Sequence, residues 1–255
     1  MSRAGRLRGE FVAASRSFLR RRTAVFFTFV FPFLIVLIFG VLVQTQPAGG
    51  GLFAQPTAWY SPGYLAVVVL FTPLSRVGSE VARHREGNRF EKLATTPLTR
   101  VEWLVAGTLV NVAVIGAAGL LLVGLLVALT GVAIPLSAAS LLVVPFVVLG
   151  VALFCGVGAL LGALADSQDG VIAASNTIAI PLLFLSETFV PPALLPAWLP
   201  TELSPLTYFS RGVRAVTYDG TGGGGVGDPL VMLGVVAALA AVSLTVGARA
   251  LPTTD

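Results

Sequence analysis

The sequence is poor in charged side chains. Asp, Glu, Lys and Arg together make up only 11% of its 255 residues, whereas hydrophobic residues make up 56%. Soluble domains carry roughly 25% charged residues, and a soluble globule of this length would lack the polar side chains that cover a water-exposed surface. The composition therefore excludes a soluble enzyme.

Cysteine, histidine and lysine each occur once. Because Cys155 is alone, a disulfide-stapled secreted scaffold is excluded. Because His84 is alone, neither a Ser–His pair nor a metal cluster is available in the apolar segments. Lys92 lies between Glu91 and Leu93, so the chain lacks the G-x-x-x-x-G-K-[ST] loop that cradles nucleotide phosphates. We expect no metal, no bound cofactor and no ATP hydrolysis in this chain.

Long uncharged runs are what the sequence has in abundance. No charge lies between Arg22 and Arg76, and none between Glu102 and Asp166. The first run, residues 23–43, would span roughly 31 Å as a helix, which matches a hydrocarbon core of about 30 Å. A cleaved signal peptide is excluded because the run is too long and no small-x-small cleavage site follows it. Six spans are predicted: residues 23–43, about 60–75, within 104–129, within 141–165, about 171–186, and 229–248.

The basic residues are distributed unevenly between the two sides of these spans. Of 16 Lys and Arg residues, seven precede the first span, six lie between the second and third, and one follows the sixth. Only Arg211 and Arg214 fall on the other side. Since basic residues favour the cytoplasmic side, we predict a multi-pass protein of the cell membrane with both termini in the cytoplasm. The same rule explains the net charge of +4, so we expect no nucleic-acid partner.

The chain is predicted to form a single all-α, polytopic membrane domain over residues 1–255. Its N-terminal tail places Leu7, Phe11 and Phe18 on one helical stripe, which predicts an amphipathic helix lying on the cytoplasmic leaflet. A disordered basic tail is the alternative. The predicted parts are an interfacial helix (1–22), spans one and two (23–75), a cytoplasmic segment (76–102), spans three to five (103–186), an outer segment (187–228) and span six (229–249).

The cytoplasmic segment is predicted to contain a short helix. The pattern indicates a charged helix, a break at Gly87, a second short helix, and a stop at Pro97. The short helix presents Phe90, Leu93 and Ala94 on one side. An apolar face beyond the membrane needs a surface to dock on. The alternative is a solvated loop, although connections are usually only a few residues long.

The outer segment is too apolar for a free loop and too rich in proline for a span. Residues 187–200 predict a re-entrant pair of short helices that enter from outside and are protected by protein. Residues 205–218 resemble a short interfacial helix. Glu187 either pairs with Arg211 or Arg214, or contacts a polar or cationic part of a substrate.

Several other residues of the spans carry weaker signals. Trp59, Tyr60 and Tyr64 are typical of an aromatic belt at the membrane surface. Gly158 and Gly162 form a G-x-x-x-G pattern that lets a neighbouring helix approach closely. Four polar residues inside predicted spans either bond across helices or line a translocation path: Asn111, Ser175, Asn176 and Thr177.

Two sets of motifs resemble the type-2 ABC transporter permeases, the drug-export and oligosaccharide-export members above all. The first is Arg85-Glu86-Gly87, followed by Leu93, Thr96-Pro97-Leu98 and Arg100. The second is Phe184-Leu185-Ser186, followed by Pro191, Leu195-Pro196, Trp198-Leu199, Ser204-Pro205-Leu206-Thr207-Tyr208 and Arg214. Their order and spacing match the family over nearly the whole chain. Glu187 departs from it, because the family more often has a small residue there.

The resemblance implies the permease half of an ATP-driven exporter of an amphiphilic drug, lipid or glycolipid. It implies a dimer with a second permease copy, contact with membrane lipid, and a separate cytoplasmic ATPase subunit that binds ATP and Mg. The residues it implies for coupling to that subunit are Arg85, Glu86, Gly87, Phe90, Leu93, Thr96 and Pro97. Those it implies for the outer gate are Glu187, Pro191, Pro196, Trp198 and Pro205. A stand-alone secondary transporter or channel, which would need an ionisable group or broken helices near the midplane, and a non-transporting assembly protein are the alternatives.

Overall fold

The chain folds into a bundle of helices. The computed structural model describes residues 2–43, 55–135, 137–218 and 227–252, and no strand occurs in these ranges. The all-α fold predicted from the sequence is therefore confirmed. The helices are α1 (Arg3–Arg20), α2 (Arg22–Ile35), α3 (Ser61–Glu86), α4 (Arg89–Ala94), α5 (Arg100–Thr130), α6 (Val143–Leu164), α7 (Gln168–Phe184), α8 (Pro205–Thr217) and α9 (Pro229–Ala250).

Five helical stretches in the described ranges are long and apolar enough to cross a membrane: Arg22–Leu42, Thr57–Glu86, Arg100–Thr130, Ala139–Leu164 and Pro229–Ala250. They correspond to predicted spans one to four and six. The first is α2 continued by a π-helical stretch, Val36–Leu42. The predicted fifth span corresponds to α7, whose 17 residues are fewer than the about 20 that a crossing usually needs. A sixth crossing stays a prediction.

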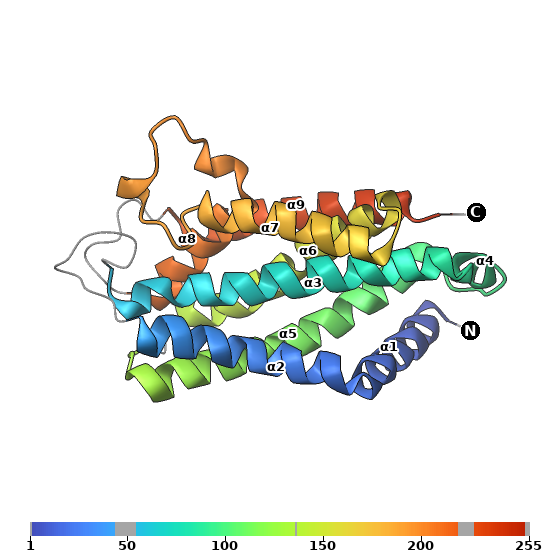
Figure 1. The fold of residues 1–255 in the computed structure, drawn as a ribbon, viewed down its shortest axis with the longest axis horizontal. Coiled ribbons are helices and arrows are strands. Elements are labelled where there is room, and N and C mark those ends of the chain that lie inside the picture. Colours follow the sequence, from blue (N-terminus) through green and yellow to red (C-terminus); the bar gives the residue numbers. More distant parts are fainter. Residues whose placement is uncertain (1, 44–54, 136, 219–226, 253–255) are drawn as a thin grey trace.

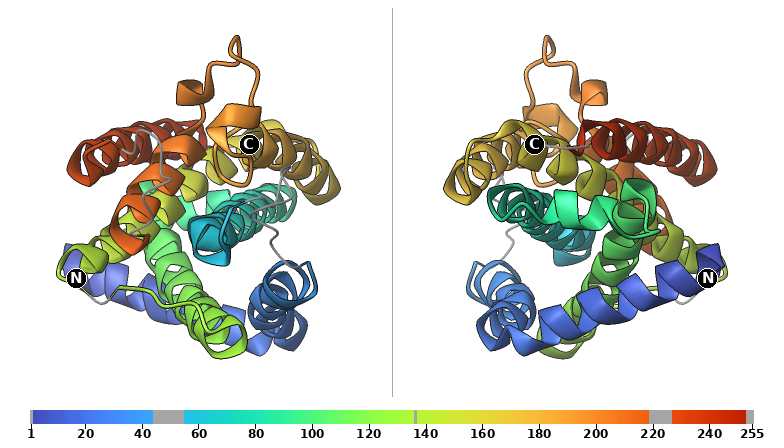
Figure 2. Two further views of the ribbon diagram at one scale, coloured as in Figure 1. Left: turned by 90° about the vertical axis from the view of Figure 1, so that its left-hand side faces the viewer. Right: turned by 90° about the vertical axis from the view of Figure 1, so that its right-hand side faces the viewer.

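The long helices run roughly along one axis, with α3 inside the bundle (Figures 1 and 2). α3 packs on α5, α6 and α7, and residues 61–70 at its start are all buried. A helix that is apolar all round is expected in such a central place. α4 lies at one end of the bundle together with the start of α1 and the end of α9, whereas α8 and residues 187–204 lie towards the other (Figure 1). We call these ends the α4 end and the α8 end.

Glycines set the distance between α6 and its two neighbours. A Cβ atom on Gly162 would lie 2.3 Å from the main-chain oxygen of Gly78 in α3, and one on Gly158 would lie 2.6 Å from another main-chain oxygen of α3. On the far side of α6, a Cβ atom on Gly156 would lie 2.4 Å from the carbonyl carbon of Ser243 in α9. The close approach predicted from the G-x-x-x-G pattern is confirmed.

The N-terminal tail and the predicted cytoplasmic segment, residues 76–102, are more helical than a solvated chain would be. Residues 3–20 form α1, which packs along the first part of α5, so the disordered-tail alternative is wrong. The predicted second span and charged helix are one continuous helix, α3. Gly78, the one glycine between Ser75 and Gly87, does not interrupt it and lies where α3 packs closely on α6. After Gly87, Asn88 adopts a left-handed conformation (φ 50°), which asparagine tolerates, and α4 begins at the next residue. The predicted break is confirmed.

Two predictions about the α8 end are wrong. Residues 187–204 form two short 3-10 turns, Pro192–Leu194 and Thr201–Leu203, in place of a pair of re-entrant helices. Four prolines among residues 187–200 remove the N–H donors that longer helices need. Three aromatic residues predicted at the membrane surface are buried in the protein: Trp59 is 3% exposed, and Tyr60 and Tyr64 are both 0% exposed. Parts of two predicted segments, residues 44–54 and 219–226, lie outside the described residues.

Candidate functional site

α4 is anchored to its own chain by a cluster of three rings. Phe90 is 3% exposed, and its ring centre lies 5.7 Å from that of His84 in α3 and 5.5 Å from that of Trp103 in α5. The rings of His84 and Trp103 are themselves 5.2 Å apart. Such edge-to-face and tilted pairs are favourable and geometrically specific. The cluster therefore fixes α4 in the angle between α3 and α5, and Phe90 is buried within this chain.

Arg85 and Glu86 join the end of α3 to the corner between α6 and α7. The Arg85 guanidinium donates to the carbonyl oxygens of Ala163, at 2.6 Å, and Ala165. The Glu86 carboxylate accepts from the main-chain N–H of Gln168, at 3.2 Å, in the first turn of α7. A cation at a helix C-terminus and an anion at a helix N-terminus both complement the helix dipole. The two residues therefore hold three helix ends together.

The start of α5 is tied to α1 and α9. Thr99 caps α5 by accepting from the N–H of Glu102 at 3.2 Å, while the Glu102 carboxylate accepts from the N–H of Thr99 at 2.9 Å. The same carboxylate pairs with Arg6 of α1, with 2.6 Å between Nη2 and Oε1. Arg100 donates to the carbonyl oxygen of Leu251, the residue that follows α9. The α4 end is therefore a connected framework rather than a set of loose loops.

All seven residues predicted for coupling lie around α4. Arg85 and Phe90 face the bundle, and Leu93 is half-buried against its core. The others are exposed: Glu86, Gly87, Thr96 and Pro97. Glu91, Lys92, Ala94 and Thr95 are exposed beside them. α4 thus has an anchored side and a free side. A role for these residues in coupling stays a prediction.

At the α8 end, Glu187 forms an ion pair with Arg211. Glu187 is 5% exposed, and the Arg211 Nε atom lies 2.6 Å from its Oε2 atom, with a second bond from Arg211 Nη2 to Oε1. The bond to Glu187 raises the pKa of Arg211. Thr201 also donates to the carboxylate, at 3.3 Å. Of the alternatives open in the sequence, pairing with Arg211 is therefore confirmed.

Arg214 of α8 bonds to the two other segments that meet at the α8 end, which are residues 57–60 and residues 187–204. It is 3% exposed, and its guanidinium carbon lies 3.8 Å from the centre of the Trp59 ring. It donates to the carbonyl oxygen of Trp59 at 3.2 Å and to that of Glu187 at 3.0 Å. Burial lowers the pKa of Arg214 to about 10, which leaves the group charged at neutral pH. Arg214 is thus buried and links these segments within the protein, rather than pointing outward from an interfacial helix.

The other predicted gate residues do not converge on one point. Pro191 is buried, and Pro205 is the first residue of α8. Pro196 and Trp198 are exposed, Trp198 by 79%, on the segment that projects beyond the helices (Figure 2). The segment is held at its base, where Thr188 shares hydrogen bonds with Ser186 at 2.6 Å and Ser210 of α8 at 3.0 Å.

The four polar residues predicted for a pathway lie on two different helices, α5 and α7. Asn111 is buried in α5, and its amide donates to the carbonyl oxygen of Gly107 in the same helix at 2.9 Å. The other three are on α7, where Ser175 is buried while Asn176 and Thr177 are exposed. α3 packs between α5 and α7 (Figure 2). These residues do not form a single polar channel within one copy of the chain.

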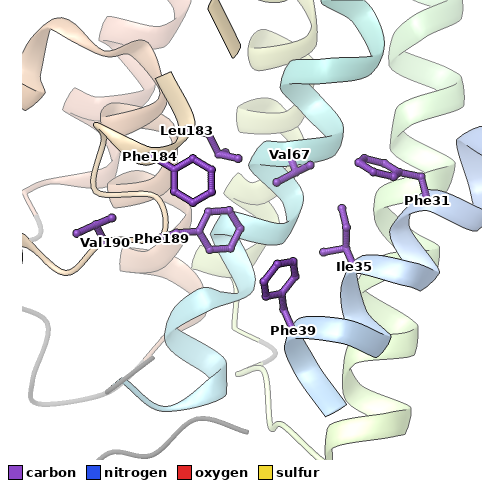
Figure 3. A pocket seen from close by; sticks show the side chains of 8 residues that line it. All are labelled: Phe31, Ile35, Phe39, Val67, Leu183, Phe184, Phe189 and Val190. Carbon is purple, nitrogen blue, oxygen red and sulfur yellow. The ribbon is translucent and has the colours of Figure 1, made fainter. Parts of the chain in front are cut away.

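An apolar pocket of about 200 Å³ lies near the α8 end, between the first span, α3 and α7 (Figure 3). No charged side chain lines it, and four of its eight lining residues are phenylalanines. Its lining residues are Phe31, Ile35, Phe39, Val67, Leu183, Phe184, Phe189 and Val190. Hydrocarbon or aromatic groups are the chemistry that such a lining accepts. The pocket has no signature in the sequence, because its walls come from three separate stretches of ordinary apolar residues.

The comparisons with known proteins agree with this architecture. No curated protein matches the chain. A family model described as ABC-2 type transporter matches residues 11–218, which run from within α1 to the end of α8. The matched region contains α4 with its anchoring rings, the α6–α7 corner and the Glu187–Arg211 pair. The chain therefore belongs to the ABC-2 type transporter family and is a membrane permease subunit of an ABC transporter.

Proposed function

We propose that the chain is the permease of an exporter that moves an apolar or amphiphilic molecule (a drug, lipid or glycolipid) out of the cell. In this proposal a separate ATPase subunit binds the α4 end, and two permease copies form the complete transporter. The observation that carries the proposal is the construction of α4, which is fixed to the bundle on one side and free on the other.

α4 is well placed to pass a displacement into the bundle. Its anchoring ring cluster includes His84 near the end of α3, and α3 runs without a break from Ser61 to Glu86. Residues 57–60 lie directly before α3 and contain Trp59, whose ring lies against the Arg214 guanidinium group. A partner that pushes on α4 would therefore act on a single continuous helix, which contains Pro73 in its interior and reaches towards the α8 end. A switch of access additionally needs two states of the bundle, which nucleotide binding to the partner would bias.

The pocket in Figure 3 supports an apolar cargo. Its volume of about 200 Å³ is smaller than the about 300–1,000 Å³ of sites that enclose drug-sized molecules. It therefore suits an acyl chain or an aromatic ring, with the rest of the molecule held elsewhere. α3 forms one wall of the pocket through Val67, so the helix that bears α4 also touches the cargo.

Orientation is part of the proposal, with the α4 end in the cytoplasm. Cysteine labelling in intact cells tests it, because the native Cys155 is fully buried and should stay unreactive. A membrane-impermeant maleimide should label Ala197→Cys, on the projecting segment, and should leave Asn88→Cys unlabelled until the cells are opened. Labelling of Asn88→Cys in intact cells would reverse the orientation and overturn the site for the ATPase subunit.

Docking at α4 is tested by a charge placed on its free side. The purified chain alone should show no ATPase activity, and its cognate ATPase subunit, when co-expressed, should form a complex with it. Ala94→Asp should weaken that complex and lower its ATPase stimulation, because an uncompensated charge is buried at the interface. Ala4→Asp, the same change at an exposed site of α1 at the same end, is the matched control. An Ala94→Asp chain that binds and stimulates normally would place the ATPase site elsewhere.

A further inference from the structure

Three arginines gather where the end of α1 meets α3. Arg76 and Arg83 are seven residues apart in α3 and therefore lie on one face of it. Arg21 occupies the corner between α1 and α2. The guanidinium group of Arg76 lies against the ring of Phe18, three residues before Arg21, so the corner between α1 and α2 is close to this face of α3. Like charges so placed repel one another, whereas Glu80, between the two arginines along α3, attracts both. Guanidinium groups stay charged in proteins, so these residues cannot relieve the repulsion by losing protons.

Two of these side chains have buried donors without a partner. Arg76 Nη1 and Arg83 Nε are enclosed by protein and make no hydrogen bond in the part of the chain that the structure describes. The guanidinium carbon of Arg76 lies 4.2 Å from the centre of the Phe18 ring of α1, which covers one face of the group and fixes its plane. A buried, charged donor that is left unpaired is costly.

The neighbouring carboxylates do not meet this need. Glu80 lies between the two arginines along α3, yet it forms no ion pair with either in the described ranges. Glu10 of α1 forms no ion pair in the described ranges either, and burial together with the charge of Glu80 raises its pKa. Among the described residues, two buried arginine donors therefore remain unpaired at this place.

The surroundings of the cluster indicate what the missing partner is. Exposed apolar side chains flank Arg21: Leu19 is 65% exposed at the end of α1, and Phe26 is 59% exposed in α2. A site with cationic donors beside an apolar surface fits a molecule with an anionic head and hydrocarbon tails. Arginine suits phosphate in particular, because its planar fork matches two phosphate oxygens.

We propose that Arg21, Arg76 and Arg83 form a binding site for the phosphate of an anionic membrane lipid, with α1 as its cover. Arg76 Nη1 and Arg83 Nε donate to the phosphate, and the acyl chains lie along the exposed apolar side chains at the corner between α1 and α2. The site lies at the end of α1, apart from the pocket of Figure 3, and does not depend on the nature of the cargo.

The test uses the full chain purified in a neutral detergent, with thermal unfolding and native mass spectrometry as readouts. Phosphatidylglycerol should raise the unfolding temperature and stay bound, whereas phosphatidylcholine with the same acyl chains should do neither. The double variant Arg76→Gln, Arg83→Gln should bind phosphatidylglycerol about tenfold more weakly or worse. The control is Arg16→Gln, Arg20→Gln, which removes two exposed charges from α1 and should leave binding intact.

Each remaining outcome decides the proposal. An equal loss of lipid binding in both double variants would mean diffuse surface charge and would overturn the site. Inorganic phosphate that gives the same stabilisation at the same concentration would overturn the lipid as its source. If the glutamine variant does not fold, Arg76→Lys, Arg83→Lys keeps the charges without the planar fork. This variant should bind severalfold more weakly, and unchanged lipid preference in it would contradict the site.

Discussion

Arg6 and Glu102 are 96 positions apart in the sequence, and two hydrogen bonds join their side chains, at 3.1 Å from Nε and 2.6 Å from Nη2. This pair connects α1 to the first turn of α5, and Glu102 simultaneously caps that turn through Thr99. One carboxylate thus positions the N-terminal helix relative to the framework that carries α4. Movement of α1 and of the α4 end should therefore be linked.

The first prediction separates the two roles of Glu102. Glu102→Gln keeps an acceptor for the Thr99 N–H but removes the charge that pairs with Arg6, so α1 should loosen while α5 stays capped. Amide hydrogen exchange should become faster in residues 3–20 and stay unchanged in residues 100–110. Thr99→Ala is the matched control, because it removes the cap and keeps the ion pair. Unchanged exchange in α1 of the Glu102→Gln chain would show that packing alone holds the helix.

The second prediction concerns the ion pair at the α8 end. Glu187→Gln keeps the shape of the side chain and leaves the Arg211 charge without its main partner, so the chain should lose about 1 to 3 kcal/mol of stability. Glu202→Gln, which removes the weaker and more exposed partner of Arg211 at 3.4 Å, should have little effect. Thermal unfolding of the two variants measures the difference. Equal unfolding temperatures would assign Glu187 a role other than structural pairing.

The third prediction tests the close contact of α3 and α6. Gly162→Ala places a methyl group 2.3 Å from the Gly78 carbonyl oxygen, which is far too close, so the helices must separate, at a cost of about 1 to 3 kcal/mol. Gly116→Ala makes the same change in α5, where nothing lies within 4 Å. Thermal unfolding of the purified chains should show a loss for the first variant only. A Gly162→Ala chain as stable as the parent would contradict the packing of these helices.

The features predicted correctly from the sequence are those with local causes. Gly87 ends α3 and a short helix follows because glycine and proline act on the chain within a few residues. Likewise, Gly158 and Gly162 lack side chains whatever helix they meet, so close packing was predictable although its partner was not. The spans follow from hydrocarbon thickness, and only α7, with Pro181 near its end, falls short of the usual length.

The features that the sequence did not predict depend on how distant segments assemble. Trp59 has the composition signal of a membrane-surface residue, but Arg214, 155 positions later, covers its ring and buries it. Similarly, nothing in the sequence around Arg85 and Glu86 indicates that their partners are at the α6–α7 corner. Charge alone limited the partners of Glu187 to two arginines, and only the fold selects between them.

The last prediction concerns the apolar pocket and rests on the proposed function. Val67→Phe enlarges the side chain on the α3 wall of the pocket. The larger side chain fills space that an apolar ligand would otherwise occupy, so the ligand should bind more weakly. Nile red, a neutral hydrophobic dye whose fluorescence rises on binding, is a suitable probe for the purified chain in detergent. We expect about tenfold weaker binding, which corresponds to about 1.4 kcal/mol. Val144→Phe is the matched control, because Val144 is 63% exposed on α6 and does not line the pocket. Equal dye affinity in the two variants would mean that the dye binds the outer surface of the helices, and the pocket would then no longer support an apolar cargo.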